Sequence, residues 1–265
     1  MRHQRSKGMG CLTVKHVENQ TRIDKLYQEG CAKIRMPTSA NEGLQAVMIN
    51  SSGGITGGDR LDWTFELGVG SALTVTSQAC ERIYASSHDV GVSRISIKIG
   101  RGAKLAWLPQ ETILFDNGAF KRSIDVELEE NAQLLMVEPI VLGRTAMGET
   151  VASGTLKDSW RVRRDGQLIH AEEMLFDGEI NHQLACRGVA SGQVAMAGLL
   201  FIGAHAESAV NAARGIIGES GGVSFWNGKL LARVIAEDSY ELRKKLVPLI
   251  ELMNWGARLP KVWAL

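Results

Sequence analysis

The chain has 265 residues, of which 22% are charged, and its formal net charge is +1. This length can bury a large core, and we expect a single domain over residues 1–265. Because the charge is almost balanced, we expect no nucleic acid and no acidic membrane as a partner. No run approaches the roughly 18 apolar residues of a membrane-spanning helix. Cys11, Cys31, Cys80 and Cys186 lie far apart without a C-x-x-C motif, which favours reduced thiols in the cytoplasm.

The first residues are basic and are followed by Gly8-Met9-Gly10-Cys11. This segment is too short and too polar for the apolar region of a secretory signal. We therefore expect residues 1–20 to form a flexible or loosely attached N-terminus.

A glycine-rich turn, NSSGGITGGDRL, occupies residues 50–61. Gly53 and Gly58 have the spacing of a phosphate-binding loop, but Asp59 stands where that loop has a lysine. A carboxylate there would repel phosphate. Residues 61–67 then alternate between apolar and polar side chains, which is typical of a strand and not of a helix. The segment predicts a turn between two strands.

Three segments share one pattern of an alternating strand, a polar turn and a second strand: residues 63–75, 95–107 and 124–136. When they are aligned on Ala72, Ala103 and Ala132, the repeats are 31 and 29 residues apart. Such self-similarity predicts stacked units of a β-solenoid or β-helix. A fainter copy at residues 160–170 would continue it. The alternative is a β-sandwich with an α+β C-terminal part.

A polar or flexible residue precedes each of these alanines closely: Gly70, Gly102 and Asn131. Tight turns often require a positive φ angle at such a position. We expect that conformation at all three residues.

The C-terminal third predicts two helices, at residues 206–217 and after Asp238. Asp238 is suited to cap the second helix, with Glu241 three residues later. Pro248 lies inside this helix and is expected to kink or break it. A buried strand at 194–202 and a hairpin around Asn227-Gly228 would complete this part.

Acidic residues follow several turns, notably Asp59, Glu111 and Glu149. If stacked coils bring these carboxylates together, their oxygens would offer a labile site for a passing divalent cation. The alternative is that Asp59 and Glu149 cap their turns and pair with Arg60 or Arg144.

Taken together, four internal motifs and the C-terminal end strongly resemble the UreD/UreH family of urease accessory proteins. They are GGITGGDRL (53–61), TSQA (76–79), WLPQETI (107–113), GRTAMGE (143–149) and LPKVW (259–263). Each motif alone is weak, but they occur in the family's order over roughly residues 20–265.

The resemblance implies a cytoplasmic, non-enzymatic chaperone with a β-helical fold and two helices. Proteins of this family bind the urease structural subunits and join UreF and the GTPase UreG, so that nickel reaches the urease active site. We therefore expect no tightly bound cofactor and only transient nickel, with Asp59, Glu111 and Glu149 bordering its passage.

As a further hypothesis, we expect the C-terminal helix and the tail to dock UreF. The residues expected to contact the partner are Trp255, Arg258, Pro260 and Trp263. From the sequence alone, the apolar tail can equally dock on the chain's own core.

Two other functions remain open. A β-solenoid enzyme would use Asp59 and Glu111 as an acid and base on a small substrate, and a pocket holding both carboxylates would favour it. A purely structural adaptor would tolerate replacement of all these acids.

Overall fold

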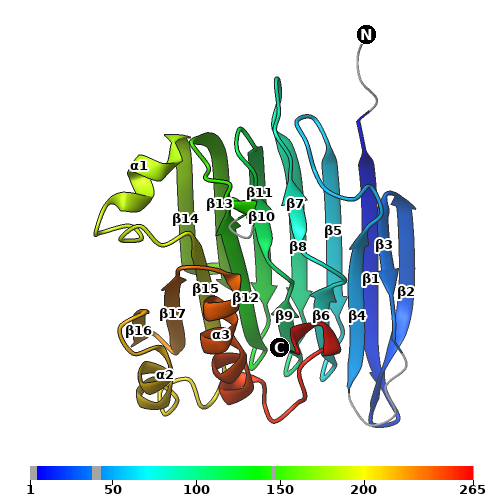
Figure 1. The fold of residues 1–265 in the computed structure, drawn as a ribbon. Helices are drawn as coiled ribbons and strands as arrows, with labels where there is room; N and C mark the ends of the chain where they lie inside the picture. The colour runs from blue at the N-terminus through cyan, green and yellow to red at the C-terminus, as the bar shows by residue number, and fades with distance from the viewer. Residues whose placement is uncertain (1–4, 38–42, 145–146, 265) are drawn as a thin grey trace.

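Strands build most of the protein (Figure 1), and the computed structural model describes residues 5–37, 43–144 and 147–264. A seven-stranded sheet has the order β14-β13-β11-β8-β5-β1-β2. Its strands are β1 (Lys7–Val17), β2 (Gln20–Gly30), β5 (Arg60–Leu67), β8 (Gly91–Ile99), β11 (Ala119–Leu128), β13 (Ser153–Arg164) and β14 (Gln167–Glu179).

A ten-stranded sheet faces it, with the order β16-β17-β15-β12-β9-β6-β4-β3, with β10 beside β12 and with β7 beside β10. Its strands are β3 (Ala32–Arg35), β4 (Leu44–Asn50), β6 (Ala72–Ser77), β7 (Glu81–Ile83), β9 (Lys104–Leu108), β10 (Thr112–Leu114), β12 (Gln133–Leu142), β15 (Ala195–Ile202), β16 (Gly221–Trp226) and β17 (Lys229–Ala236). The main core lies between the two sheets.

The chain crosses repeatedly between the sheets, so the predicted β-solenoid is confirmed. β5, β8, β11 and β13 pair in parallel in one sheet, and β6, β9 and β12 pair in parallel in the other. Trp63 lies opposite Ile95, which lies opposite Ile124, so equivalent residues of successive coils stack inside. Alternation buries one face of each strand, and the other face meets solvent.

The three turns between paired strands have the expected positive φ angles of 68°, 66° and 58°, at Gly70, Gly102 and Asn131. The alanine alignment is wrong by one residue in the first coil, because Ala72 pairs with Lys104 and not with Ala103. The buried position after the first turn belongs to Ser71. Ser71 is about as small as alanine and fills the position that Ala103 and Ala132 fill in the next coils. The sequence alignment instead placed Ala72 at this position.

The fourth copy joins the stack only with its first half. β13 continues the parallel ladder beside β11. The chain then turns back, and β14 pairs with β13 antiparallel in the same sheet instead of crossing. The solenoid therefore ends here, and β14 forms the edge of the seven-stranded sheet.

Residues 7–17 are an integral strand, which corrects the expectation of a loosely attached N-terminus for this part of residues 1–20. β1 pairs with β5 in parallel and with β2 antiparallel. Its inward positions begin with Gly8 and Gly10, which hid the alternation in the sequence. A Cβ atom on Gly10 would lie 2.6 Å from the Trp63 ring, so the missing side chain makes room for the tryptophan. Residues 1–4 lie outside the described residues.

Strand β12 is buried on both faces and joins two cores. The second core lies between the ten-stranded sheet and the helices α2 (Val210–Ile217) and α3 (Ser239–Met253), with the 3-10 helix η2 (Lys261–Trp263). A short helix α1 (Ile180–Ala185), which the sequence did not predict, follows β14. None of the helices in the described ranges has the length and apolarity needed to cross a membrane.

Local signals in the C-terminal part are confirmed. The Asp238 carboxylate accepts a hydrogen bond of 2.8 Å from the Glu241 N–H and caps α3. Asn227 and Gly228 both have positive φ between β16 and β17. Pro248 does not break α3, which continues to Met253.

Replacement of Gly10 by alanine is expected to destabilise the fold, because the new methyl group would overlap the Trp63 ring. We expect a loss of about 1–3 kcal/mol in unfolding free energy, measured by urea denaturation. Gly215→Ala is the control, since Gly215 lies exposed in α2 with open space around it. That change should be neutral or stabilise by roughly 0.5–1 kcal/mol. Equal stability of both variants would contradict the packing assigned to β1.

Candidate functional site

One inward row of the seven-stranded sheet is polar, between apolar rows. It runs across Ser93, Arg122 and Asp158, which lie opposite one another on β8, β11 and β13, and it ends at the apolar Leu61 of β5. Arg122 and Asp158 are 8% and 3% exposed. Since solenoid interiors are filled by apolar side chains, a buried charged pair here requires neutralisation by its neighbours.

The Arg122 guanidinium holds the row together. It donates two hydrogen bonds of 2.9 and 2.8 Å to the Asp158 carboxylate, and its Nη1 lies 2.5 Å from Glu138 Oε2. The Trp107 and Trp160 indole N–H groups donate to Glu138 (2.6 Å) and to Asp158 (3.1 Å). One cation thus faces two carboxylates, so the cluster carries a formal charge of −1 inside the protein.

Glu138 reaches this cluster from the opposite sheet, at a gap in the ladder beside β12. β9 pairs with residues 133–136, and β10 pairs with residues 140–142. Pro139, which has no N–H to donate, occupies the gap. Glu138 shares the inward phase of Met136 and Ile140 and points between the sheets.

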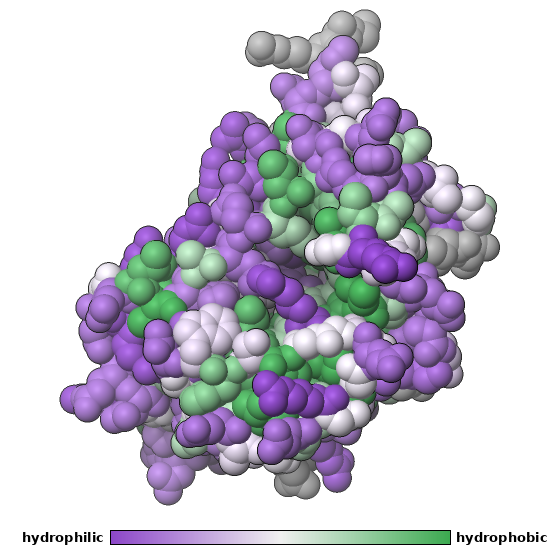
Figure 2. All heavy atoms as spheres, turned by 90° about the vertical axis from the view of Figure 1, so that its left-hand side faces the viewer, coloured by the Kyte–Doolittle hydropathy of each residue, from purple (hydrophilic) through white to green (hydrophobic). Residues whose placement is uncertain are grey.

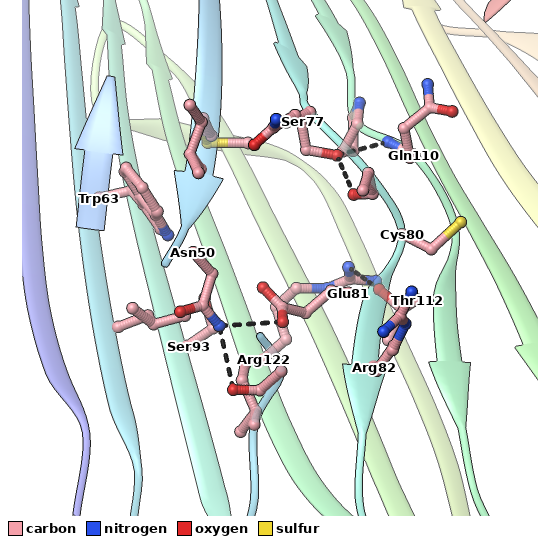
Figure 3. A pocket seen from close by; sticks show the side chains of 18 of the residues that line it. Asn50, Trp63, Ser77, Cys80, Glu81, Arg82, Ser93, Gln110, Thr112 and Arg122 are labelled. Atoms are coloured by element: carbon pink, nitrogen blue, oxygen red, sulfur yellow. Dashed lines mark hydrogen bonds between the residues drawn. The ribbon is translucent and has the colours of Figure 1, made fainter. Parts of the chain in front are cut away.

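A pocket of about 260 Å³ adjoins the cluster, and Glu138 forms part of its wall. Figure 3 shows Glu81 and Arg122 in the same wall. This volume accommodates several water molecules. Asn50 donates a 3.0 Å hydrogen bond to Glu81 and a 3.2 Å bond to the Gly54 carbonyl. The glycine-rich turn is therefore part of the pocket wall.

A second pocket of about 290 Å³ lies on the other side of Glu138. Glu138, Asp158 and Trp160 line it from inside, and apolar residues such as Met174 and Met196 from β14 and β15. Figure 2 looks onto this side of the molecule, where apolar patches alternate with polar ones. Because Glu138 lines both pockets, the charge cluster is the partition between them.

Two pocket carboxyls have raised pKa values. Burial raises the pKa of Glu81 to about 7; the hydrogen bond from Asn50 opposes this, and the nearby charge of Asp59 adds to it. Burial also raises the pKa of Glu138; Arg122 opposes this shift and Asp158 supports it. Both groups can therefore exchange protons, or bind a cation in place of a proton, near neutral pH.

Asp59, the first predicted site residue, closes the glycine-rich turn. Its two oxygens accept hydrogen bonds from the backbone N–H groups of Ser6 (2.7 Å) and Thr56 (2.9 Å). The turn-capping alternative is thus confirmed for Asp59. Its charge nevertheless acts on Glu81 in the pocket.

Glu111, the second, anchors the C-terminal helix. Arg243 and Ser239 of α3 donate to its carboxylate, at 2.6 and 2.9 Å for the shortest contacts, and Cys80 Sγ lies 3.2 Å away. Burial would raise the pKa of Glu111, but the hydrogen bond and charge of Arg243 outweigh burial and lower it. A lowered pKa does not suit a general acid.

Glu149, the third, pairs with Arg144 on the surface at 2.7 Å, as the alternative for this residue predicted. Neither Asp59 nor Glu111 lines either interior pocket, so no observation favours the acid–base enzyme. Among residues 5–37, 43–144 and 147–264, no group of three or more His, Cys, Asp or Glu side chains is arranged to hold a metal ion.

The predicted partner-binding tail packs largely on the chain's own core. Trp263 is fully buried and donates a 2.9 Å hydrogen bond to the Leu108 carbonyl, and Pro260 is buried beside it. Trp255 is half-buried and donates to Gln133, whereas Arg258 is exposed. For Pro260 and Trp263, the structure therefore corrects the expectation of a partner-facing surface.

Sequence reasoning missed Glu81, Arg122, Glu138 and Asp158. A signal was present for two of them. In β11 and β13, Arg122 and Asp158 stand in the apolar phase of the alternation, between Phe120 and Ile124 and between Leu156 and Trp160. A charged residue in that phase points into the interior.

Comparison with known proteins agrees with this architecture. The family model of the UreD urease accessory protein matches residues 6–264. The urease accessory protein UreD of Agrobacterium fabrum is 48% identical over the whole chain and 93% of the relative's length. UreD of Rhizobium johnstonii is 49% identical, over 100% of this chain and 97% of the relative, and UreD 1 of Brucella anthropi is 49% identical, over 98% and 95%.

Arg122→Met is expected to destabilise the protein strongly, because it leaves Glu138 and Asp158 as uncompensated buried carboxylates. We expect a loss of about 3–5 kcal/mol in urea unfolding. The control is Arg94→Met, which removes an exposed pair with Asp62 and should cost about 0–1 kcal/mol. Similar losses for both variants would show that the cluster is not essential to the interior.

The raised pKa of Glu81 predicts a pH effect on stability. Between its unfolded value of 4.5 and about 7, the folded protein binds more protons than the unfolded chain, so stability falls as pH rises through this window. We expect unfolding free energy, measured relative to Glu81→Gln, to fall by about 1–3 kcal/mol from about pH 5 to about pH 8. Glu66→Gln, on the exposed outer face, is the control and should show no such difference. A flat difference for Glu81→Gln would contradict the raised pKa.

Proposed function

The chain belongs to the UreD family of urease accessory proteins, and from this we propose that it is a non-enzymatic scaffold for nickel insertion into urease. Membership gives it a role in urease maturation. The proposed partners are the urease structural subunits, UreF and UreG, and the proposed site of action is the cytoplasm. Nickel is cargo here, and no cofactor is retained.

The observation that carries this proposal is the polar partition between the two pockets. A divalent cation entering the first pocket would meet Glu81 and then Glu138 and Asp158, which together carry one negative charge more than Arg122 when both are ionised. Carboxylate oxygens and water are hard ligands that exchange readily, which favours passage over storage. Deprotonation of the raised-pKa carboxyls would accompany entry of the ion.

The acids predicted from sequence take different places in this proposal. Asp59 lines neither pocket, but its charge acts on Glu81 in the first pocket. Glu111 holds α3 against the ten-stranded sheet, and Glu149 forms an ion pair with Arg144. In this proposal UreF docks on the outer faces of α2 and α3. Of the four tail residues expected to contact it, Trp255 and Arg258 are accessible, whereas Pro260 and Trp263 are buried.

We expect co-expression of this chain with the urease structural subunits, UreG and tagged UreF to yield a captured complex whose nickel-dependent urease activity requires this chain. Glu81→Gln and Glu138→Gln should lower that activity at least severalfold while leaving capture unchanged, because they remove charge from the route and not from the surface. The assay is urease activity after a fixed exposure to nickel.

Asp62→Asn is the matched control, since Asp62 lies on the outer face of β5 and pairs with the exposed Arg94. It should activate urease normally. Failure of the folded chain to associate with either partner would overturn the scaffold. Capture with full activation by both pocket variants would leave a structural adaptor without a nickel route.

A further inference from the structure

A buried lysine on β17, next to the edge strand β16 of the ten-stranded sheet, has no carboxylate partner among the described residues. Lys229, the first residue of β17, is 2% exposed. Its ammonium donates a 2.7 Å hydrogen bond to the Ile169 carbonyl and lies 4.4 Å from the centre of the Trp226 ring. An ammonium has three N–H donors, and lysines are almost never fully buried without a paired charge.

The acceptor that holds Lys229 comes from an irregularity in β14. His170 lies opposite Val162 and Leu168 lies opposite Arg163, so Ile169 is an extra residue without a partner on β13. Bulges of this kind redirect backbone groups and occur often beside binding sites. Here the bulge turns a carbonyl toward the opposite sheet, where Lys229 binds it.

The surrounding groove keeps a positive charge. It is lined from β14 by Ile169 and His170, and from β16 and β17 by Ser224, Trp226, Lys229 and Arg233. Glu172 neutralises Arg233, at 3.0 Å, and its other oxygen lies 3.5 Å from His170 Nε2. No carboxylate of the described chain forms an ion pair with Lys229, so the groove retains one uncompensated cation.

We propose that this groove binds a carboxylate group, with Lys229 as its central contact and Ser224 and Arg233 at its rim. A singly charged carboxylate matches the single unpaired ammonium, whereas a doubly charged phosphate would leave excess negative charge beside Glu172. Ile169, Trp226 and Leu231 offer apolar contacts for the chain that carries the carboxylate. The carboxylate belongs either to a small free acid or to an acidic side chain of a partner polypeptide.

The test is binding of two probes to the purified full chain at constant ionic strength, by calorimetric titration. One probe is free butyrate, and the other is a capped peptide with one glutamate between apolar residues, compared with its glutamine counterpart. We expect the glutamate peptide, butyrate or both to bind, and affinity to fall about tenfold or more in Lys229→Met.

Lys245→Met is the matched control, because Lys245 also donates to a backbone carbonyl, that of Ile216, but lies outside the groove. It should bind as the unmodified chain does. Butyrate binding assigns the site to small acids, and peptide binding alone assigns it to an acidic partner segment. Two results would overturn the proposal. The first is equal binding of the glutamate and glutamine peptides together with no binding of butyrate, which is measured on the unmodified chain. The second is unchanged affinity in a folded Lys229→Met variant.

Discussion

The stacking of parallel coils in register is the constraint on which the rest of this structure depends. It places each inward side chain against its counterpart one coil away, as Ser93, Arg122 and Asp158 show. A charge in such a row cannot reach solvent, so it must be neutralised by the next coil or by the facing sheet. Arg122 is neutralised by both kinds of neighbour. It pairs with Asp158 on the next coil of its own sheet and with Glu138 on the facing sheet. The same register gives the apolar rows their continuity, and Arg122, Glu138 and Asp158 form one ionic layer between them.

This layer connects the fold with the proposed function. The alternation of β12 points Glu138 inward, beside the break between β9 and β10, and Glu138 lines both interior pockets. Replacing the cluster by apolar residues of similar size would often cost nothing in stability. This is why we propose a role in binding or transfer for the buried ionic layer. The C-terminal part has a different role, because Glu111 and Arg243 fasten α3 to the sheet and Trp263 closes the second core.

Much of the fold could be predicted from sequence because it depends on local sequence patterns. Alternation and turn residues at Gly70, Gly102 and Asn131 predicted the coils, and Asp238 with Glu241 predicted the start of α3. Two kinds of feature were not predicted from the sequence. Gly8 and Gly10 carry no side chain, so a strand that buries them showed no apolar alternation. The site escaped because Arg122, Glu138 and Asp158 are distant in sequence and meet only through coil stacking, whereas the acids beside turns proved to hold backbone N–H groups and arginines.

The most direct test of the central claim is the nickel content of urease isolated from the assembled complex, counted per active site after a fixed exposure to nickel. With the unmodified chain, we expect a content close to full occupancy. With Glu81→Gln combined with Glu138→Gln, we expect a markedly lower content in a complex of unchanged composition. Equal nickel content in the two complexes would contradict a route through the interior and would leave the charge layer without a part in nickel delivery.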